Sequence, residues 1–105
     1  MPQFAVHRNP NPDTRNTIPL LLDVQSDLLG GLATRVVIPL YVPAAVRGSV
    51  IGTLMPQVTV DDASYVAVTS ELAGIPEKAL GAQVGDLSAH RYDIVAALDL
   101  LITGI

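Results

Sequence analysis

The last part of the chain predicts a helix that is apolar on nearly every side. From Ile94 onward its only charged side chain is Asp99. The apolar residues at helical spacing are Leu87, Ile94, Leu98, Leu101 and Ile102, and most other positions hold Val95, Ala96, Ala97 and Leu100. A 105-residue domain buries a modest fraction of its surface and does not easily enclose such a helix. We therefore expect a protein partner, a second copy of the chain or both to cover it, unless one side is covered by its own domain and the other is merely rich in alanine.

The segments before this helix predict a mainly β domain. Alternating or apolar runs bounded by turn residues predict strands at 3–8, 19–25, 35–40, 57–60 and 64–69, the last two joined in a hairpin across 61–63. Pro39 has no backbone N–H, so an edge, a bulge or a bend is expected there. Residues 43–52 predict a connection with one helical turn, and 75–81 predict a short helix. The terminal helix is expected to begin at Asp86 or Ser88, either of which can cap it, and to end at Ile102 before Gly104.

Length and composition predict a single domain spanning residues 1–105. Half of the residues are apolar and 15% are charged, which is typical of a chain that forms a core. The absence of cysteine excludes disulfides and thiolate chemistry. A net charge of −4 with 4% aromatic residues argues against a nucleic-acid-binding domain. The chain shows no signal-peptide pattern and no apolar run near the ~20 residues that span a bilayer, so we expect a cytoplasmic protein without membrane contact.

Few residues form a pattern that is typical of catalysis. His90 and Asp93 lie three positions apart on the expected helix, but no third metal ligand has matching spacing. The serines lie in no recognisable nucleophile motif, and Gly30-Gly31 matches neither a phosphate-binding loop nor a dinucleotide fingerprint. We expect no catalytic residue, no metal site and no cofactor.

One enzymatic alternative uses charged residues of the strand-rich half, namely His7, Arg8, Asp13, Arg15 and Arg35. Two arginines with a histidine or a carboxylate can hold a phosphodiester and move its proton, as in a metal-independent ribonuclease. The alternative is that these are loop charges facing solvent. Residues 1–60 hold four Arg and three Asp, whereas residues 61–105 hold two basic and seven acidic side chains. The acidic half is either a solvated face or a docking surface for a basic partner segment.

Several motifs occur in an order that is more specific than any one of them. They are Leu22-Asp23-Val24-Gln25-Ser26-Asp27-Leu28-Leu29, then Val36-Val37-Ile38-Pro39-Leu40, then Val84-Gly85-Asp86-Leu87-Ser88, and finally Gly104-Ile105 after the apolar helix. Together they resemble the CcdB toxin family, the toxins of CcdA–CcdB addiction modules. The similarity covers nearly the whole chain and is weakest in the proline-rich loop 9–18.

The resemblance implies a fold and a function. The fold is mainly β with a C-terminal α-helix, an SH3-like small β-barrel shared with the MazF and Kid toxins, and it forms a homodimer partly through that helix. The function is that of a type II toxin that binds the A subunit of DNA gyrase and traps the gyrase–DNA cleavage complex without catalysis. A CcdA-like antitoxin neutralises the toxin, and the pair represses its own operon, so that the toxin meets DNA only indirectly through the antitoxin complex.

The resemblance also assigns gyrase-binding residues, which are Leu28, Leu29, Asp99, Ile102, Thr103, Gly104 and Ile105. Gly104 and Ile105 match the family outright, and the two leucines replace a pair of isoleucines. Asp99 stands where asparagine is usual, Ile102 where phenylalanine is usual, and Thr103 where the family has a tryptophan. Losing a tryptophan hot spot costs on the order of 2 kcal/mol, or about thirtyfold in affinity. Two alternatives therefore stay open: a degenerate or retargeted CcdB-like toxin, and a MazF- or Kid-like ribonuclease toxin.

Overall fold

The computed structural model describes residues 2–46, 48 and 52–104. Its strands are β1 (Ala5–Arg8), β2 (Leu20–Asp23), β3 (Thr34–Tyr41), β4 (Gln57–Val60), β5 (Ala63–Ala67), β6 (Ala73–Pro76) and β7 (Gln83–Asp86). Its 3-10 turns are η1 (Asp27–Leu29), η2 (Pro43–Ala45), η3 (Thr69–Glu71), η4 (Glu77–Ala79) and η5 (Ser88–His90), and its α-helix is α1 (Arg91–Thr103). Among the described helices, none is long and apolar enough to cross a bilayer.

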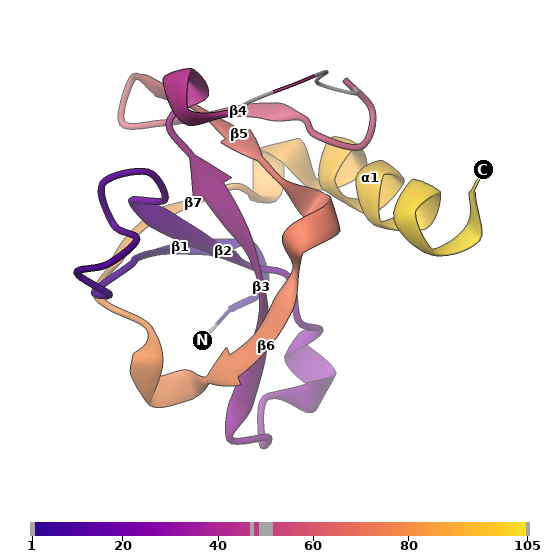
Figure 1. The fold of residues 1–105 in the computed structure, drawn as a ribbon. Helices are drawn as coiled ribbons and strands as arrows, with labels where there is room; N and C mark the ends of the chain where they lie inside the picture. The colour runs from indigo at the N-terminus through magenta and orange to yellow at the C-terminus, as the bar shows by residue number, and fades with distance from the viewer. Residues whose placement is uncertain (1, 47, 49–51, 105) are drawn as a thin grey trace.

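The strands form one antiparallel sheet that curls into a half-barrel (Figure 1). The order is β4-β5-β3-β2-β1-β7, and β6 pairs with β3 beside this path. The eight-residue strand β3 is central because it pairs with β2 on one side and with both β6 and β5 on the other. The mainly β domain with a terminal helix that the sequence predicts is therefore confirmed.

The strand register places one row of apolar side chains against α1. Val6, Leu22 and Ile38 lie opposite one another on neighbouring strands and are buried. In β4 the alternation is complete, because Val58 and Val60 are buried while Gln57 and Thr59 are exposed. The buried core also contains Phe4, Leu20, Val24, Leu40, Ala67, Leu87 and Ile94. Burying each large side chain contributes about 1.5–3 kcal/mol, so this row is the main source of stability.

Pro39 is part of the central strand β3, so of the edge, bulge or bend expected there, the edge is wrong. It pairs with Leu21 of β2, and its carbonyl accepts from the Val68 N–H at 3.1 Å. Its nitrogen faces the same side as that carbonyl, at the point where the partner of β3 changes from β6 to β5. The missing N–H therefore falls in a gap between two ladders, where it interrupts neither of them.

Two elements near the C-terminus differ from the sequence prediction. Ile75 and Pro76 end strand β6, so the expected helix over 75–81 shrinks to the single turn η4. Residues 83–86 form β7 on β1, so the terminal helix begins only at Arg91 after the turn η5. Both strands are short, and pairing with β3 and β1 determines them more than local propensity does.

The predicted hairpin turn and the predicted helix stop are confirmed, whereas the predicted cap at Asp86 or Ser88 is wrong, because α1 begins after His90 and no side chain caps it. Asp61 and Asp62 adopt positive φ angles of 50° and 66° in the tight hairpin between β4 and β5. The Asp86 carboxylate accepts from the Ser88 N–H at 2.8 Å, and hydrogen bonds from Ser88 lower the pKa of Asp86. Gly104 ends α1 with φ +75°, and its N–H donates to the Leu100 carbonyl. The expected helical turn in 43–52 is η2, whereas part of that segment lies outside the described residues.

Candidate protein-binding surface

The turn η1 holds apolar side chains out in solvent. Leu28 is 94% exposed, and Leu29 and Leu32 are each half exposed. Ser26 caps the turn, because its hydroxyl oxygen accepts from the Leu28 N–H at 3.2 Å. A loop that exposes several leucines together is typical of a surface that binds another protein.

A buried ion pair lies at the base of this loop. The Arg35 guanidinium on β3 donates to the Asp23 carboxylate of β2 through Nε at 2.7 Å and Nη2 at 3.0 Å, and both side chains are at most 1% exposed. The hydrogen bond to Asp23 raises the pKa of Arg35 above its ordinary value. A bidentate pair of this kind fixes the geometry of the strands just before η1.

The end of α1 forms a second exposed group. Ile102 is 76% exposed, and Asp99, Thr103 and Gly104 are exposed beside it. The Thr103 hydroxyl donates to the Asp99 carbonyl at 2.6 Å, so its polar group is bonded within the helix. Ile105, which the sequence places in the same group, lies outside the described residues.

The two groups belong to separate elements of the chain. Figure 1 shows η1, which follows β2, in the lower part of the molecule beside β6 and the end of α1 at the upper right, whereas loop 9–18 lies on the left. Within the described residues, no hydrogen bond joins Leu28 or Leu29 to the helix end. The two leucines therefore lie together in η1, and Asp99 and Thr103 are hydrogen-bonded to each other in α1. Among the residues that the structure describes, the two groups are not bonded to one another.

Its own domain covers only one side of α1. Ile94 and Ala97 are buried and Val95 and Leu98 pack against the same core, whereas Leu100 and Leu101 are partly exposed outside it. Tyr92 in the first turn is 87% exposed and lies on the same helical face as Asp99, seven residues on. The helix end is therefore not enclosed within its own chain.

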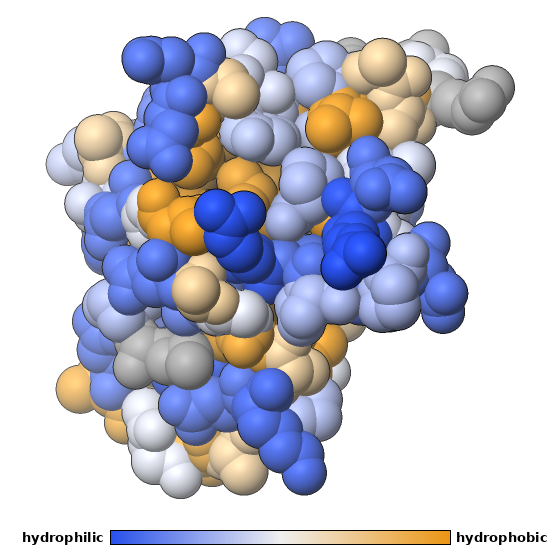
Figure 2. Space-filling view, turned by 90° about the vertical axis from the view of Figure 1, so that its left-hand side faces the viewer, coloured by the Kyte–Doolittle hydropathy of each residue, from blue (hydrophilic) through white to orange (hydrophobic). Residues whose placement is uncertain are grey.

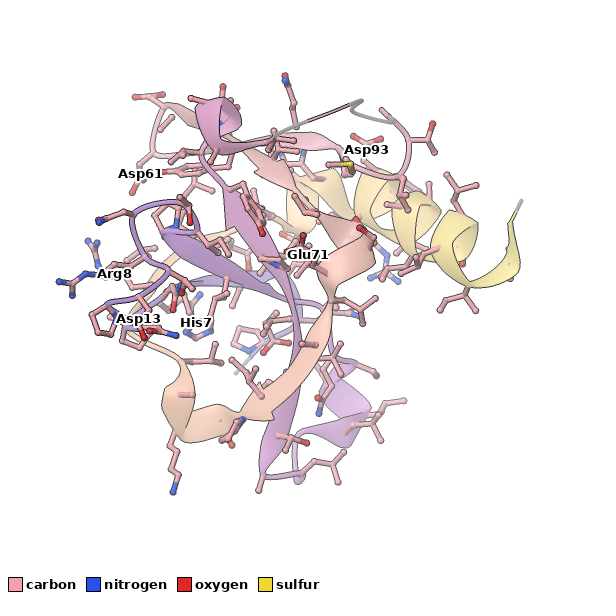
Figure 3. The ribbon with its side chains drawn as sticks, in the orientation of Figure 1. His7, Arg8, Asp13, Asp61, Glu71 and Asp93 are labelled. Atoms are coloured by element: carbon pink, nitrogen blue, oxygen red, sulfur yellow. The ribbon has the colours of Figure 1, made fainter. Side chains whose placement is uncertain are left out.

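The residues of the ribonuclease alternative do not converge. Arg35 is engaged with Asp23, and His7 is buried with Nδ1 at 3.0 Å from the Gly81 carbonyl oxygen. His7 lies opposite Leu21, which lies opposite Pro39, and Arg35 is four residues farther along β3, or about 13 Å. Figure 3 shows Arg8 pointing outward at the left edge of the molecule, away from His7.

Part of that set does share a surface. Arg8 and Arg15 line one shallow pocket together with Asn9 and Gly81. Both arginines are exposed, which agrees with the alternative that they are loop charges facing solvent. His90 is half buried and Asp93 exposed, and the described residues contain no group of three His, Asp or Glu side chains that could hold a metal ion.

One surface feature has no counterpart in the sequence predictions. A groove of about 540 Å³ lies on the outer face of the sheet beside loop 9–18, and it is lined by Asn9, Pro12, Ile18, Leu21, Val37 and Ile75 among others. Figure 2 shows this side of the molecule, where orange apolar surface is exposed among blue side chains. The available signal was Leu21, an apolar residue on the outward face of β2, but the groove also needs β6, which the sequence did not predict.

Similar proteins were found at the level of both sequence and structure. The family model of the CcdB protein matches residues 3–104. A mycobacterial endoribonuclease in complex with its cognate antitoxin has a TM-score of 0.74 at 17% identity, with 97% of this chain and 94% of that chain covered. The Mycobacterium tuberculosis toxin MazF-mt6 has a TM-score of 0.70 at 18% identity, covering 92% of this chain and 94% of that chain.

These matches carry different weight. At this level of identity the two solved structures establish the fold alone, a MazF- and CcdB-like half-barrel with one C-terminal helix. The family model spans nearly the whole chain, including η1 and α1, and so confirms the resemblance seen in the motifs. The chain belongs to the CcdB family of toxins from toxin–antitoxin systems.

Proposed function

We propose that this toxin binds the A subunit of DNA gyrase and traps the gyrase–DNA cleavage complex, using η1 and the end of α1. The observation that carries the proposal is the exposure of Leu28 and Ile102, at positions where the family resemblance assigns gyrase contacts. When a partner buries apolar side chains that are held in solvent, the free energy falls by about 25 cal/mol per Å² of apolar surface. The proposed contact residues are Leu28, Leu29, Asp99, Ile102, Thr103, Gly104 and Ile105.

The toxin acts by binding, and no chemical step is assigned to it. Of the residues in the ribonuclease alternative, Arg35 is held in a buried ion pair and His7 is buried as well. Trapping an enzyme in mid-reaction needs only a surface that prefers that state of the enzyme. This function places the toxin inside the cell, where gyrase and its DNA are found.

The same proposal includes a homodimer. Leu100 and Leu101 of α1 are partly exposed and do not belong to the core cluster, so they offer apolar surface to a second copy. A two-fold dimer would present η1 and the helix end twice, which suits a two-fold symmetric target. Sedimentation at micromolar concentration is expected to give a dimer, and a monomer would contradict this part of the proposal.

A CcdA-like antitoxin completes the system. The mycobacterial endoribonuclease of similar fold was solved with its cognate antitoxin, which supports a protein partner for this fold. We place part of the antitoxin on the groove beside loop 9–18, because its lining is apolar and open. Any contact with DNA then occurs through the antitoxin rather than through this acidic chain.

A degenerate or retargeted toxin is the second candidate, and Thr103 favours it. A threonine whose hydroxyl is bonded to its own helix offers a partner only a methyl group, where the family presents a tryptophan. In this case the chain keeps antitoxin binding, and it either acts only weakly on gyrase or acts on another target.

Binding to a fragment of gyrase A from the same host separates the candidates. The parent toxin is expected to bind, and Leu28→Asp and Ile102→Asp are each expected to weaken binding at least tenfold, because each puts a charge into an apolar contact. Arg15→Asp is the matched control, since Arg15 is also exposed but lies in loop 9–18, away from η1 and the end of α1. If the parent does not bind but Thr103→Trp does, and its expression without antitoxin stops growth, the degenerate candidate replaces the first.

A further inference from the structure

One buried side chain, Gln25, holds the loop that carries Leu28 and Leu29 through hydrogen bonds. Its Nε2 donates to the Leu29 carbonyl at 2.9 Å, and its Oε1 accepts from the Val36 N–H of β3 at 3.0 Å. Its own backbone N–H donates to the Asp23 carboxylate at 3.0 Å, and that carboxylate also holds Arg35. Gln25 therefore connects η1 to β3, and its own backbone is hydrogen-bonded to the buried ion pair.

A second contact fastens the start of η1 from the exposed side. The Asp27 carboxylate accepts from the Gln3 backbone N–H at 2.8 Å, and the Gln3 side chain donates to the Val24 carbonyl at 3.2 Å. Within the turn, the Leu29 and Gly30 N–H groups donate to the Ser26 and Asp27 carbonyls. All of these bonds hold backbone or polar groups, and the Leu28 side chain stays in solvent.

The chemistry of Gln25 is more specific than packing requires. A buried amide is costly unless both its oxygen and its nitrogen are hydrogen-bonded, and here both are. An apolar side chain of similar size would fill the space but would leave the Leu29 carbonyl and the Val36 N–H without this partner. A glutamine at this position thus fixes the path of η1 rather than merely filling the base of the loop.

We propose that Gln25 is a positioning residue for the partner surface. Its hydrogen bond to the Leu29 carbonyl holds η1 in the conformation that projects Leu28 toward an apolar cavity on a protein partner. We call the two side-chain hydrogen bonds of Gln25, to the Leu29 carbonyl and from the Val36 N–H, the clamp. A loop ordered in advance loses less conformational entropy on binding, so the clamp raises affinity although Gln25 itself touches no partner. The benefit to binding rests on the proposed function, whereas the clamp on η1 is a property of the free chain.

Gln25→Glu tests the donor alone. Glutamate has nearly the same shape and keeps an oxygen for the Val36 N–H, but when ionised it cannot donate to the Leu29 carbonyl. When protonated it regains an O–H donor, so lowering the pH is expected to restore the clamp in this variant only. The charged groups near it are Asp23, Arg35 and Asp27, and Glu77 acts on Arg35 from η4. Gln25→Met, which removes both side-chain bonds, is the second variant if the glutamate disturbs folding.

Amide hydrogen exchange of the free protein measures the clamp directly. At about pH 7.5, Gln25→Glu is expected to lower the protection factors of the Leu29 and Gly30 amides about tenfold, with recovery toward parent values as the pH falls. The amides of Leu22 and Ile38 report global stability and are expected to change much less. Equal losses at all four amides, or no loss in η1 with either variant, would overturn the clamp.

Binding to the gyrase A fragment then tests the positioning role. Gln25→Glu is expected to weaken binding several-fold at about pH 7.5 and to regain it at lower pH, whereas Leu28→Ala weakens binding at every pH. If η1 loosens and Leu28→Ala weakens binding but neither Gln25 variant does, the positioning role is overturned. If none of these variants changes binding, the proposed partner surface fails while the clamp stands.

Discussion

The two exposed groups of the proposed partner surface, η1 and the end of α1, are held in place in different ways. η1 has no buried residue of its own and is held by hydrogen bonds to Gln25 and to the Gln3 backbone. The end of α1 is an extension of a helix whose inner side is fixed by apolar packing of Ile94 and Ala97. The exposed leucines therefore depend on polar groups buried beneath them, and the exposed isoleucine depends on apolar packing two turns away.

The largest expected effect comes from breaking the polar support. Arg35→Met leaves the buried Asp23 carboxylate without its bidentate partner, and we expect a loss of about 3–5 kcal/mol in the free energy of unfolding. Urea denaturation monitored by circular dichroism measures it. Arg15→Met is the control, with an expected change within about 0.5 kcal/mol because Arg15 is exposed. A loss below about 1 kcal/mol for Arg35→Met would show that the ion pair does not support the loop.

A comparable effect is expected from breaking the apolar support of the helix. Ile94→Ala removes a buried side chain, and we expect it to cost about 2–5 kcal/mol. Ile102→Ala removes the same atoms from an exposed position and is expected to change stability by less than about 0.5 kcal/mol. Thermal unfolding of both variants sharpens the comparison. A similar cost at both positions would mean that the helix end is buried in solution, as a dimer through Ile102 would bury it.

A smaller effect is expected where α1 ends. Gly104 has φ +75°, a conformation that alanine adopts only with strain, so Gly104→Ala is expected to cost about 1 kcal/mol. Gly31→Ala is the matched control, because a Cβ there meets open space and no positive φ is required. Equal melting temperatures for the two variants would show that the cap does not fix the helix end.

The smallest effect is expected from a polar contact that is not buried. The Tyr41 hydroxyl donates to the Glu71 carboxylate, and this bond raises the pKa of Tyr41 to about 12. Because the folded pKa lies above the ordinary value near 10, the bond stabilises the fold below about pH 10 and this contribution is lost between about pH 10 and 12. With Glu71 exposed, we expect less than about 1 kcal/mol.

Absorbance titration of the tyrosinate checks this contact. The parent is expected to show a late ionisation near pH 12 that Tyr41→Phe lacks, and Glu71→Gln is expected to shift it down toward the ordinary value. A late ionisation that persists in Tyr41→Phe would assign it to another tyrosine. Comparison with Arg35→Met then shows how much more a buried polar pair contributes to the free energy of unfolding than an exposed pair in the same chain.

The sequence predicted most of the fold where local signals and pairing agree. The hairpin at Asp61 and Asp62, the strands of the first half and the helix stop at Gly104 follow from turn chemistry and alternation. β6 and β7 each contain a glycine and only four residues, so their propensity is low and only β3 and β1 give them structure.

The exposure of the residues in the proposed partner surface was predictable, but the groups that hold them in place were not. The resemblance located Leu28 and Ile102, and the apolar helix indicated that its end would be uncovered. The ion pair between Asp23 and Arg35 was not predictable, since these residues are twelve positions apart and meet only through the register of β2 and β3. Sequence pattern had placed Arg35 among catalytic candidates, where a charged side chain is expected to be free.

A cleavage assay with purified toxin and purified gyrase from the same host tests the central claim most directly. Supercoiled DNA with gyrase and the parent toxin is expected to accumulate linear product after the protein is removed with detergent and protease. The product is expected to decrease with Leu28→Asp or Ile102→Asp and to be unaffected by Arg15→Asp. No change in cleavage or supercoiling, at toxin concentrations well above micromolar, would contradict gyrase poisoning by this surface.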